Sequence, residues 1–180
     1  MNHIAARPSG LLYALNGTAP TIHPTAWVAP TAVLIGDVRL GPNANIWFNC
    51  VLRADTNPII VGARSNIQDG TIIHVSAKSF PTLIGDDVTV GHAAIIHACT
   101  LKNHAFVGMG ATVLDGAVIE EGGMLGAAAL LTPGKRIGPN ELWTGSPAKL
   151  ARIMTAEDRA RFDRGARHYV DLAQRYSAKS

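Results

Sequence analysis

An aliphatic residue recurs every six positions along most of this 180-residue chain. The series has short breaks and contains Ile22, Val28, Leu34, Leu40, Ile46, Leu52, Val61, Ile67, Ile73, Ile84, Val90, Ile96, Leu101, Val107, Val113, Ile119, Leu125, Leu131, Ile137 and, as its last candidate, Trp143. A period of six fits neither a helix nor a simple alternating strand, but it fits short strands joined by tight turns in a parallel β-helix. Three such units per coil predict about seven stacked coils.

The chain changes character after Pro147. Thr155 stands three residues before Asp158, which is an N-cap signature. The following apolar residues fall at helical spacing with charges between them: Phe162, Ala166, Tyr169, Val170 and Ala173. The sequence therefore predicts an all-β solenoid domain over residues 1–150 and, within residues 151–180, an amphipathic α-helix of about 20 residues packed along the coils.

Charge, cysteine and hydropathy patterns exclude several classes of protein. Lys and Arg balance Asp and Glu at 9 each over residues 1–150, and the excess of 7 over 4 is confined to residues 151–180. The body thus lacks the basic stripe that nucleic-acid binding needs. Cys50 and Cys99 lie far apart, which favours buried thiols over a disulfide or a cysteine zinc site. No apolar run approaches 18 residues and residues 1–20 lack a signal-peptide pattern, so we expect a cytoplasmic protein without a membrane partner.

Three of the seven histidines gain meaning from the repeat. With three six-residue units per coil, the aliphatic residue of every third unit lies on the same face. The residues that directly follow these aliphatic residues therefore stack about 4.8 Å apart: Arg53, His74 and His97. His92 stands two places after the aliphatic Val90, on a different face. Asp69 stands two places after Ile67 and therefore lies beneath His92.

Two histidines at strand spacing can share a metal, but His92 lies around a corner of the same prism. It can reach the ion of a neighbouring chain if the prisms pack about a three-fold axis. The sequence therefore predicts a homotrimer with three sites, each taking His74 and His97 from one subunit and His92 from the next. Three imidazoles with an open fourth position are the ligand set of a catalytic zinc, and they also suit Fe(II) or Co(II).

These residues resemble the gamma-class carbonic anhydrase family, especially its compact bacterial members. The resemblance extends from about Ile22 to Pro147 and includes the terminal helix; it is carried by Arg53-Ala54-Asp55, Asn66-Ile67-Gln68-Asp69-Gly70, His74, Gly91-His92 and His97. It implies a left-handed β-helix of hexapeptide repeats and a zinc-dependent lyase that interconverts carbon dioxide and bicarbonate.

The resemblance also implies roles for individual residues. His74, His92 and His97 bind the metal, and Gln68 orients the metal-bound water. Arg53 and Asp55 tie subunits together and line the bicarbonate position, although an interface salt bridge would explain them equally well. Asp69 contacts the metal ligands and not the metal itself. Tyr169 reaches the pocket in this interpretation, whereas a core aromatic residue on the helix is the structural alternative.

The loops depart from the most active members of the family. Those members carry an acidic residue directly after the Arg-x-Asp run and further acidic residues after the first histidine ligand. Here Thr56 follows Asp55, and the excursion Val75–Pro81 contains no carboxylate. We therefore expect slow turnover limited by proton export. His104 is an alternative proton acceptor, but it falls on another face from His97.

Three other functions remain open. The same trimer and metal could hydrolyse a thioester or related acyl substrate, for which the apolar Phe80-Pro81 would suit a larger substrate. A hexapeptide acyltransferase would use a histidine as a general base and need no metal. A non-catalytic trimeric assembly module would need neither a metal nor a general base.

Overall fold

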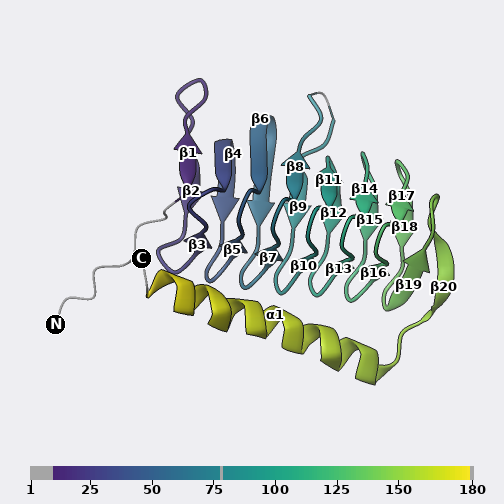
Figure 1. Cartoon of the computed structure of the whole chain (residues 1–180). Helices are drawn as coiled ribbons and strands as arrows, with labels where there is room; N and C mark the ends of the chain where they lie inside the picture. Colours follow the sequence, from purple (N-terminus) through teal and green to yellow (C-terminus); the bar gives the residue numbers. More distant parts are fainter. Residues whose placement is uncertain (1–9, 78, 179–180) are drawn as a thin grey trace.

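The computed structural model describes residues 10–77 and 79–178. It is a left-handed parallel β-helix of about seven turns with one C-terminal helix (Figure 1), which confirms the predicted fold class. Residues 1–9 and 78 of the expected solenoid, including Lys78 of the excursion, lie outside the described residues, as do residues 179–180 of the tail.

The coils form a prism with three faces. Face 1 contains β1 (Leu11–Tyr13), the first half of β4 (Val33–Leu40), the first half of β6 (Val51–Val61), β8 (Ile72–His74), β11 (Ile95–His97), β14 (Thr112–Val113) and β17 (Leu130–Leu131). Face 2 contains β2 (Thr21–Ile22), the second halves of β4 and β6, β9 (Thr82–Ile84), β12 (Thr100–Leu101), β15 (Val118–Ile119) and β18 (Arg136–Ile137). Face 3 contains β3 (Trp27–Val28), β5 (Asn45–Ile46), β7 (Asn66–Ile67), β10 (Thr89–Val90), β13 (Phe106–Val107), β16 (Met124–Leu125) and β19 (Glu141–Thr144).

The six-residue series forms the core. Every residue of the series except Ile22 and Trp143, which are partly buried, is at most 5% exposed. The small residues four places further on also point inward and are fully buried: Ala32, Ala44, Val88, Ala94, Ala111 and Ala117. Because each coil is only a few residues wide, most inward positions hold aliphatic side chains, and Ser65, Thr71 and Thr82 are fully buried exceptions.

Both breaks in the series lie where face 1 turns into face 2. At the first break β6 continues as a strand, and between Ala54 and Ile59 it has three more residues than the corresponding segment of β4. At the second break, the described residues 75–77 and 79–81 lie outside the coil, and the chain returns at β9. The Asn57 amide donates to the Ser76 carbonyl at 2.6 Å, so the two excursions lie against each other.

The chain leaves the coils through a strand and the predicted helix. β20 (Lys149–Ile153) pairs antiparallel with β19, so the expected division at residue 150 falls inside a strand. Helix α1 (Ala156–Ser177) begins with the predicted Thr155 cap, which forms a capping box with Asp158. It runs along face 3 (Figure 1), and Ala166 and Ala173 are its buried residues. No helix in the described part of the chain is long and apolar enough to cross a membrane.

Both cysteines are free and buried, as predicted. Burial raises the pKa of Cys50 to about 12 and also raises the pKa of Cys99. Neither thiol is therefore an available nucleophile or metal ligand in the folded chain.

Candidate metal centre

His74 and His97 lie side by side at the ends of two hydrogen-bonded strands. The register pairs Arg53 with His74 and His74 with His97, which is the predicted stacking. His74 Nδ1 and His97 Nε2 are 3.2 Å apart. Two nitrogens bound tetrahedrally to one zinc ion at about 2.0–2.1 Å would be separated by about 3.3 Å. The spacing of this imidazole pair therefore fits two ligands of a single metal ion.

Asp55 holds the second ring nitrogen of His74. Its Oδ1 lies 3.0 Å from His74 Nε2, and its other oxygen accepts a hydrogen bond from Arg53. Burial on its own would raise the pKa of Asp55, but the hydrogen bond with His74 and the charge of Arg53 together lower that pKa. The carboxylate is thus ionised and fixes the orientation of the imidazole.

Asp115 plays the same part for His97, and sequence reasoning missed it. Its Oδ1 lies 2.5 Å from His97 Nδ1. The register pairs Ile96 with Val113, so Asp115 stands two places after the unit residue of the next coil. Asp69 has this same offset from Ile67, and that shared offset is the signal that could have found Asp115.

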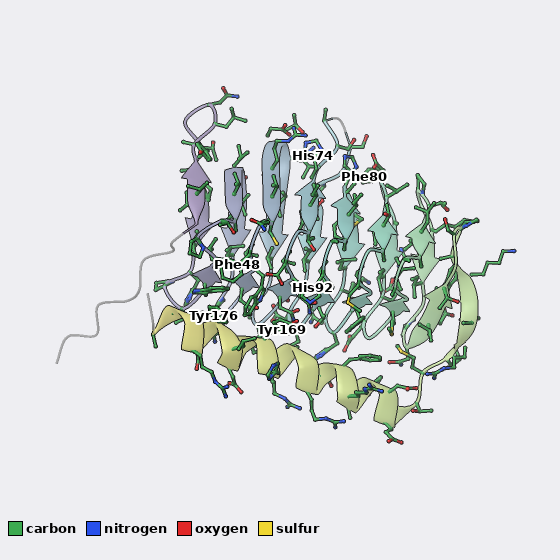
Figure 2. The ribbon with its side chains drawn as sticks, in the orientation of Figure 1. Phe48, His74, Phe80, His92, Tyr169 and Tyr176 are labelled. Atoms are coloured by element: carbon green, nitrogen blue, oxygen red, sulfur yellow. The ribbon has the colours of Figure 1, made fainter. Side chains whose placement is uncertain are left out.

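His92 lies around the corner from the pair. β10 pairs with β7 so that His92 stacks over Asp69, and His92 Nδ1 lies 2.9 Å from Asp69 Oδ2. Figure 2 shows His92 beside helix α1 and His74 at the far end of face 1. Among the described residues of one chain, no three His, Cys, Asp or Glu side chains are gathered closely enough to hold a metal ion.

Gln68 and Tyr169 lie on the side of His92. Gln68 is 6% exposed and donates through Nε2 to Asn66 Oδ1 at 3.0 Å. The Tyr169 ring packs edge-on against Trp47, with ring centroids 5.3 Å apart, which is the contact of a core aromatic residue. Burial, followed by the charge of Asp69, raises the pKa of Tyr169.

The candidate residues thus form two half-sites on one chain. The first contains Arg53, Asp55, His74, His97 and Asp115, and the second contains Gln68, Asp69, His92 and Tyr169. Each imidazole has an aspartate at one ring nitrogen, which leaves the other nitrogen as the donor to a metal. The donor set therefore fits a three-histidine metal, but a single chain does not bring the three histidines together.

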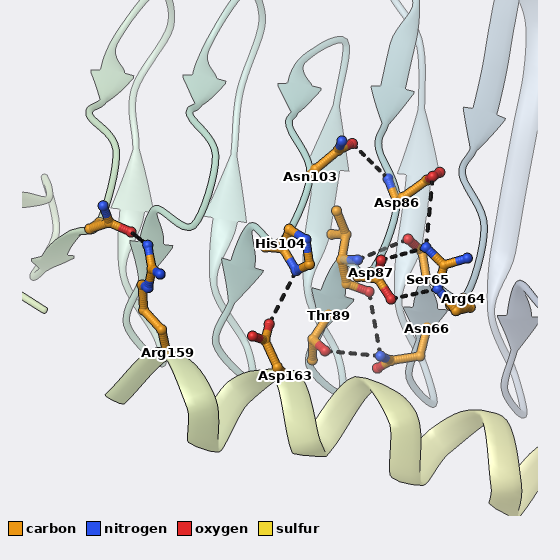
Figure 3. A network of polar contacts seen from close by, with 12 residues as sticks. Arg64, Ser65, Asn66, Asp86, Asp87, Thr89, Asn103, His104, Arg159 and Asp163 are labelled. Carbon is orange, nitrogen blue, oxygen red and sulfur yellow. Dashed lines mark hydrogen bonds and ion pairs between the residues drawn. The ribbon is translucent and has the colours of Figure 1, made fainter. Parts of the chain in front are cut away.

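His104 belongs to neither half-site. It lies at the corner between faces 2 and 3, where its Nδ1 is 3.1 Å from Asp163 Oδ1 of helix α1 (Figure 3). The same corner carries the bidentate pair of Arg64 with Asp87, at 2.7 and 2.6 Å. His104 thus helps to hold the helix on the solenoid.

Comparison with known proteins identified close relatives. The chain is 47% identical over 167 residues to "Gamma carbonic anhydrase 2, mitochondrial" of Arabidopsis thaliana, a match that covers 90% of this chain and 60% of the plant protein. It is 42% identical over 168 residues to "Carbonic anhydrase" of Geobacillus kaustophilus, covering 93% and 92% of the two chains. No protein-family model matches the chain.

A solved structure of similar sequence has the same fold. It is described as a hexapeptide transferase family protein from Anaplasma phagocytophilum, and it aligns with a TM-score of 0.89 at 48% identity. The alignment covers 92% of this chain and 98% of the other. The likeness therefore includes both the coils and most of the remaining chain.

Proposed function

Since the chain belongs to the gamma carbonic anhydrase family, we propose that it interconverts carbon dioxide and bicarbonate at a metal centre shared between two copies of the chain. One observation supports the proposal. The ring nitrogens of His74 and His97 are spaced as two ligands of one metal ion, whereas His92, which also bonds to an aspartate, lies on another corner of the prism. A second copy is what completes the ligand set.

The surface between the two half-sites supports a trimer. Face 1 is bounded by the corner that carries His97 and by the corner that carries His92. Its outward residues Ile72 and Ile95 are neighbours in the register and are 49% and 45% exposed. Face 3 is covered by helix α1, whereas these two isoleucines are uncovered in a single chain. Burying face 1 against a second copy would cover them and bring His92 of that copy to the pair.

Zinc is the metal that we propose, and Fe(II) and Co(II) suit the same ligands. A metal held there supplies Lewis acidity, which lowers the pKa of water to about 7. The chain's own residues have separate tasks. Arg53, with a side chain 48% exposed beside Asp55, offers a cation to bicarbonate. Gln68 is fixed through its Nε2 by Asn66, which leaves its carbonyl oxygen to orient water.

Hydration activity is expected to require metal and to rise with buffer concentration at neutral pH. Asp55, Asp69 and Asp115 each bond to an imidazole, and His104 is engaged with Asp163 at a different corner. Each of these carboxylates is already held by an imidazole, so we expect external buffer to carry the proton. Stopped-flow rates over a series of imidazole concentrations, at fixed pH and ionic strength, measure this dependence.

The same protein preparation separates the possible functions. Metal content combined with hydration supports the proposal. Fast turnover that is independent of buffer would contradict the expectation that external buffer carries the proton. Metal without hydration would favour a metal-dependent acyl hydrolase, for which the exposed Phe80, whose ring lies over Gly116 next to Asp115, is the supporting observation. A protein without metal in both aerobic and anaerobic preparations would refute the shared metal centre and leave an acyltransferase or an assembly module.

Ile95→Glu is expected to convert the trimer to monomers and to abolish metal binding. The substitution places a charge in the centre of face 1, where burial without a partner costs several kcal/mol. Size-exclusion chromatography with light scattering, and metal analysis of the peak, measure both effects. Leu83→Glu is the matched control, because Leu83 is also an outward apolar residue but lies on face 2 and is 37% exposed. A trimeric Ile95→Glu protein would show that face 1 is not the interface.

A further inference from the structure

Two large apolar side chains are exposed beside the candidate ligands. Phe80 is 45% exposed and Met109 is 59% exposed. They come from different corners of the prism, and neither has a role in the proposed function. Exposed apolar side chains that lie together can mark an interface or a ligand-binding surface.

Phe80 lies on the side of His74 and His97, one coil above His97. Its loop is held at both ends, because Ser76 N donates to the Phe80 carbonyl at 3.2 Å and Thr82 Oγ1 donates to the His74 carbonyl at 2.7 Å. The ring covers Gly116, where an added Cβ would lie 3.4 Å from the ring carbons. Gly116 directly follows Asp115, the partner of His97. Phe80 therefore forms the upper rim of the first half-site.

Met109 lies on the side of His92, also one coil above it. β10 pairs with β13 so that Val90 is opposite Val107. His92 and Met109 each stand two places after these residues and therefore belong to the same column. Met109 thus forms the upper rim of the second half-site, as Asp69 forms its lower rim.

We propose that Phe80 of one copy and Met109 of the next form a single apolar wall above the shared metal centre. The inference rests on the proposed function, because it needs the same pairing of corners that completes the ligand set. Met109 precedes β14 in the same coil to which Gly116 belongs, so the two side chains have the same height along the prism. The lower side of the site is polar, with Arg53 and Asp55 on one half and Asp69 on the other.

This asymmetry assigns a substrate class to each side of the site. The apolar wall suits a small neutral molecule without hydrogen-bond donors, such as carbon dioxide, and it cannot solvate an anion. The anionic product would be stabilised on the opposite side, toward Arg53. Phe80 and Met109 are therefore residues that select the neutral substrate, without taking part in the chemical step.

Cross-linking tests the geometry without any activity measurement. A Phe80→Cys/Met109→Cys chain treated with a short bismaleimide is expected to give covalent dimers and trimers on denaturing gels. Cys50 and Cys99 are 0% and 2% exposed and should not react in the folded protein. Leu83→Cys/Met109→Cys is the matched control, because Leu83 points outward from face 2; it should remain single-chain. Equal cross-linking of the two pairs would overturn the proposal.

Activity then tests the assigned role. Met109→Gln should lower kcat/KM for carbon dioxide hydration about tenfold, since it replaces an apolar contact by a hydrated amide, with metal content and trimer mass unchanged. If the protein is trimeric and holds metal but Phe80 and Met109 do not cross-link, the apolar wall is wrong and the proposed function stands. If the protein is monomeric under all conditions, both are wrong. Unchanged kcat/KM in a cross-linking protein would remove the assigned selectivity.

Discussion

Chains that carry His92→Ala and chains that carry His74→Ala are expected to restore metal binding when they are refolded together. Each variant alone should lose the metal and all metal-dependent hydration, because every site in its trimer lacks one imidazole. In a trimer that contains both variants, one interface joins an intact His74 and His97 pair to an intact His92. Random mixing of equal amounts should therefore restore about one quarter of the sites.

The control uses two histidines from the same half-site. Chains with His74→Ala and chains with His97→Ala should never complement each other, since each pair is built within one chain by β8 and β11. Metal analysis and hydration rates of both mixtures give the comparison. Native mass spectrometry confirms that mixed trimers have formed. Mixed trimers of the first kind that bind no more metal than their parents would refute the shared site.

Val107→Asp is expected to unfold the chain. Val107 is fully buried between Val90 and Leu125 of the two neighbouring strands, and neither of these apolar side chains can receive a carboxylate. Burial of an unpaired charge costs several kcal/mol, which is a large part of the stability of a typical domain. The same reasoning applies to Leu125, which is also fully buried. Circular dichroism during a urea titration measures the loss.

Thr100→Asp provides the comparison for this variant. Thr100 precedes the buried Leu101 in β12 and points outward from face 2, so the same carboxylate would there remain in water. It should change the urea midpoint little. A soluble Val107→Asp protein with the midpoint of the unmodified chain would mean that the side chains of the six-residue series do not form the interior.

The fold could be predicted because one physical rule repeats along the chain. Each coil is too narrow for more than one large inward side chain per face, so the aliphatic period reports the register directly. The pairings of Arg53 with His74 and of His74 with His97 follow from counting alone. The Thr155 capping box was likewise local, since its two partners are three residues apart.

The rest depended on contacts that counting along one strand does not reveal. Asp115 bonds to His97 although the register places it beyond the residue opposite His97, because an imidazole extends along the coil as well as across it. β20 has no six-residue signal, as it pairs antiparallel outside the repeat. The position of Phe80 over Gly116 depends on a loop whose length was visible in the sequence but whose direction was not.

The segment that begins at Gly145 ends the stack of coils by covering the last strands of two faces. A parallel β-helix exposes a row of unpaired backbone groups at each end, onto which strands of another molecule could add without limit. Here Leu130 N donates to the Gly145 carbonyl, Ala148 N donates to the Leu130 carbonyl, and β20 occupies the edge of β19. Lys149 and Arg152 place charges on that final strand, which disfavours edge-to-edge growth. Residues 145–153 therefore cover the last strands of faces 1 and 3 and limit fibre formation there, which a further repeat unit could not do because it would expose a new edge of its own.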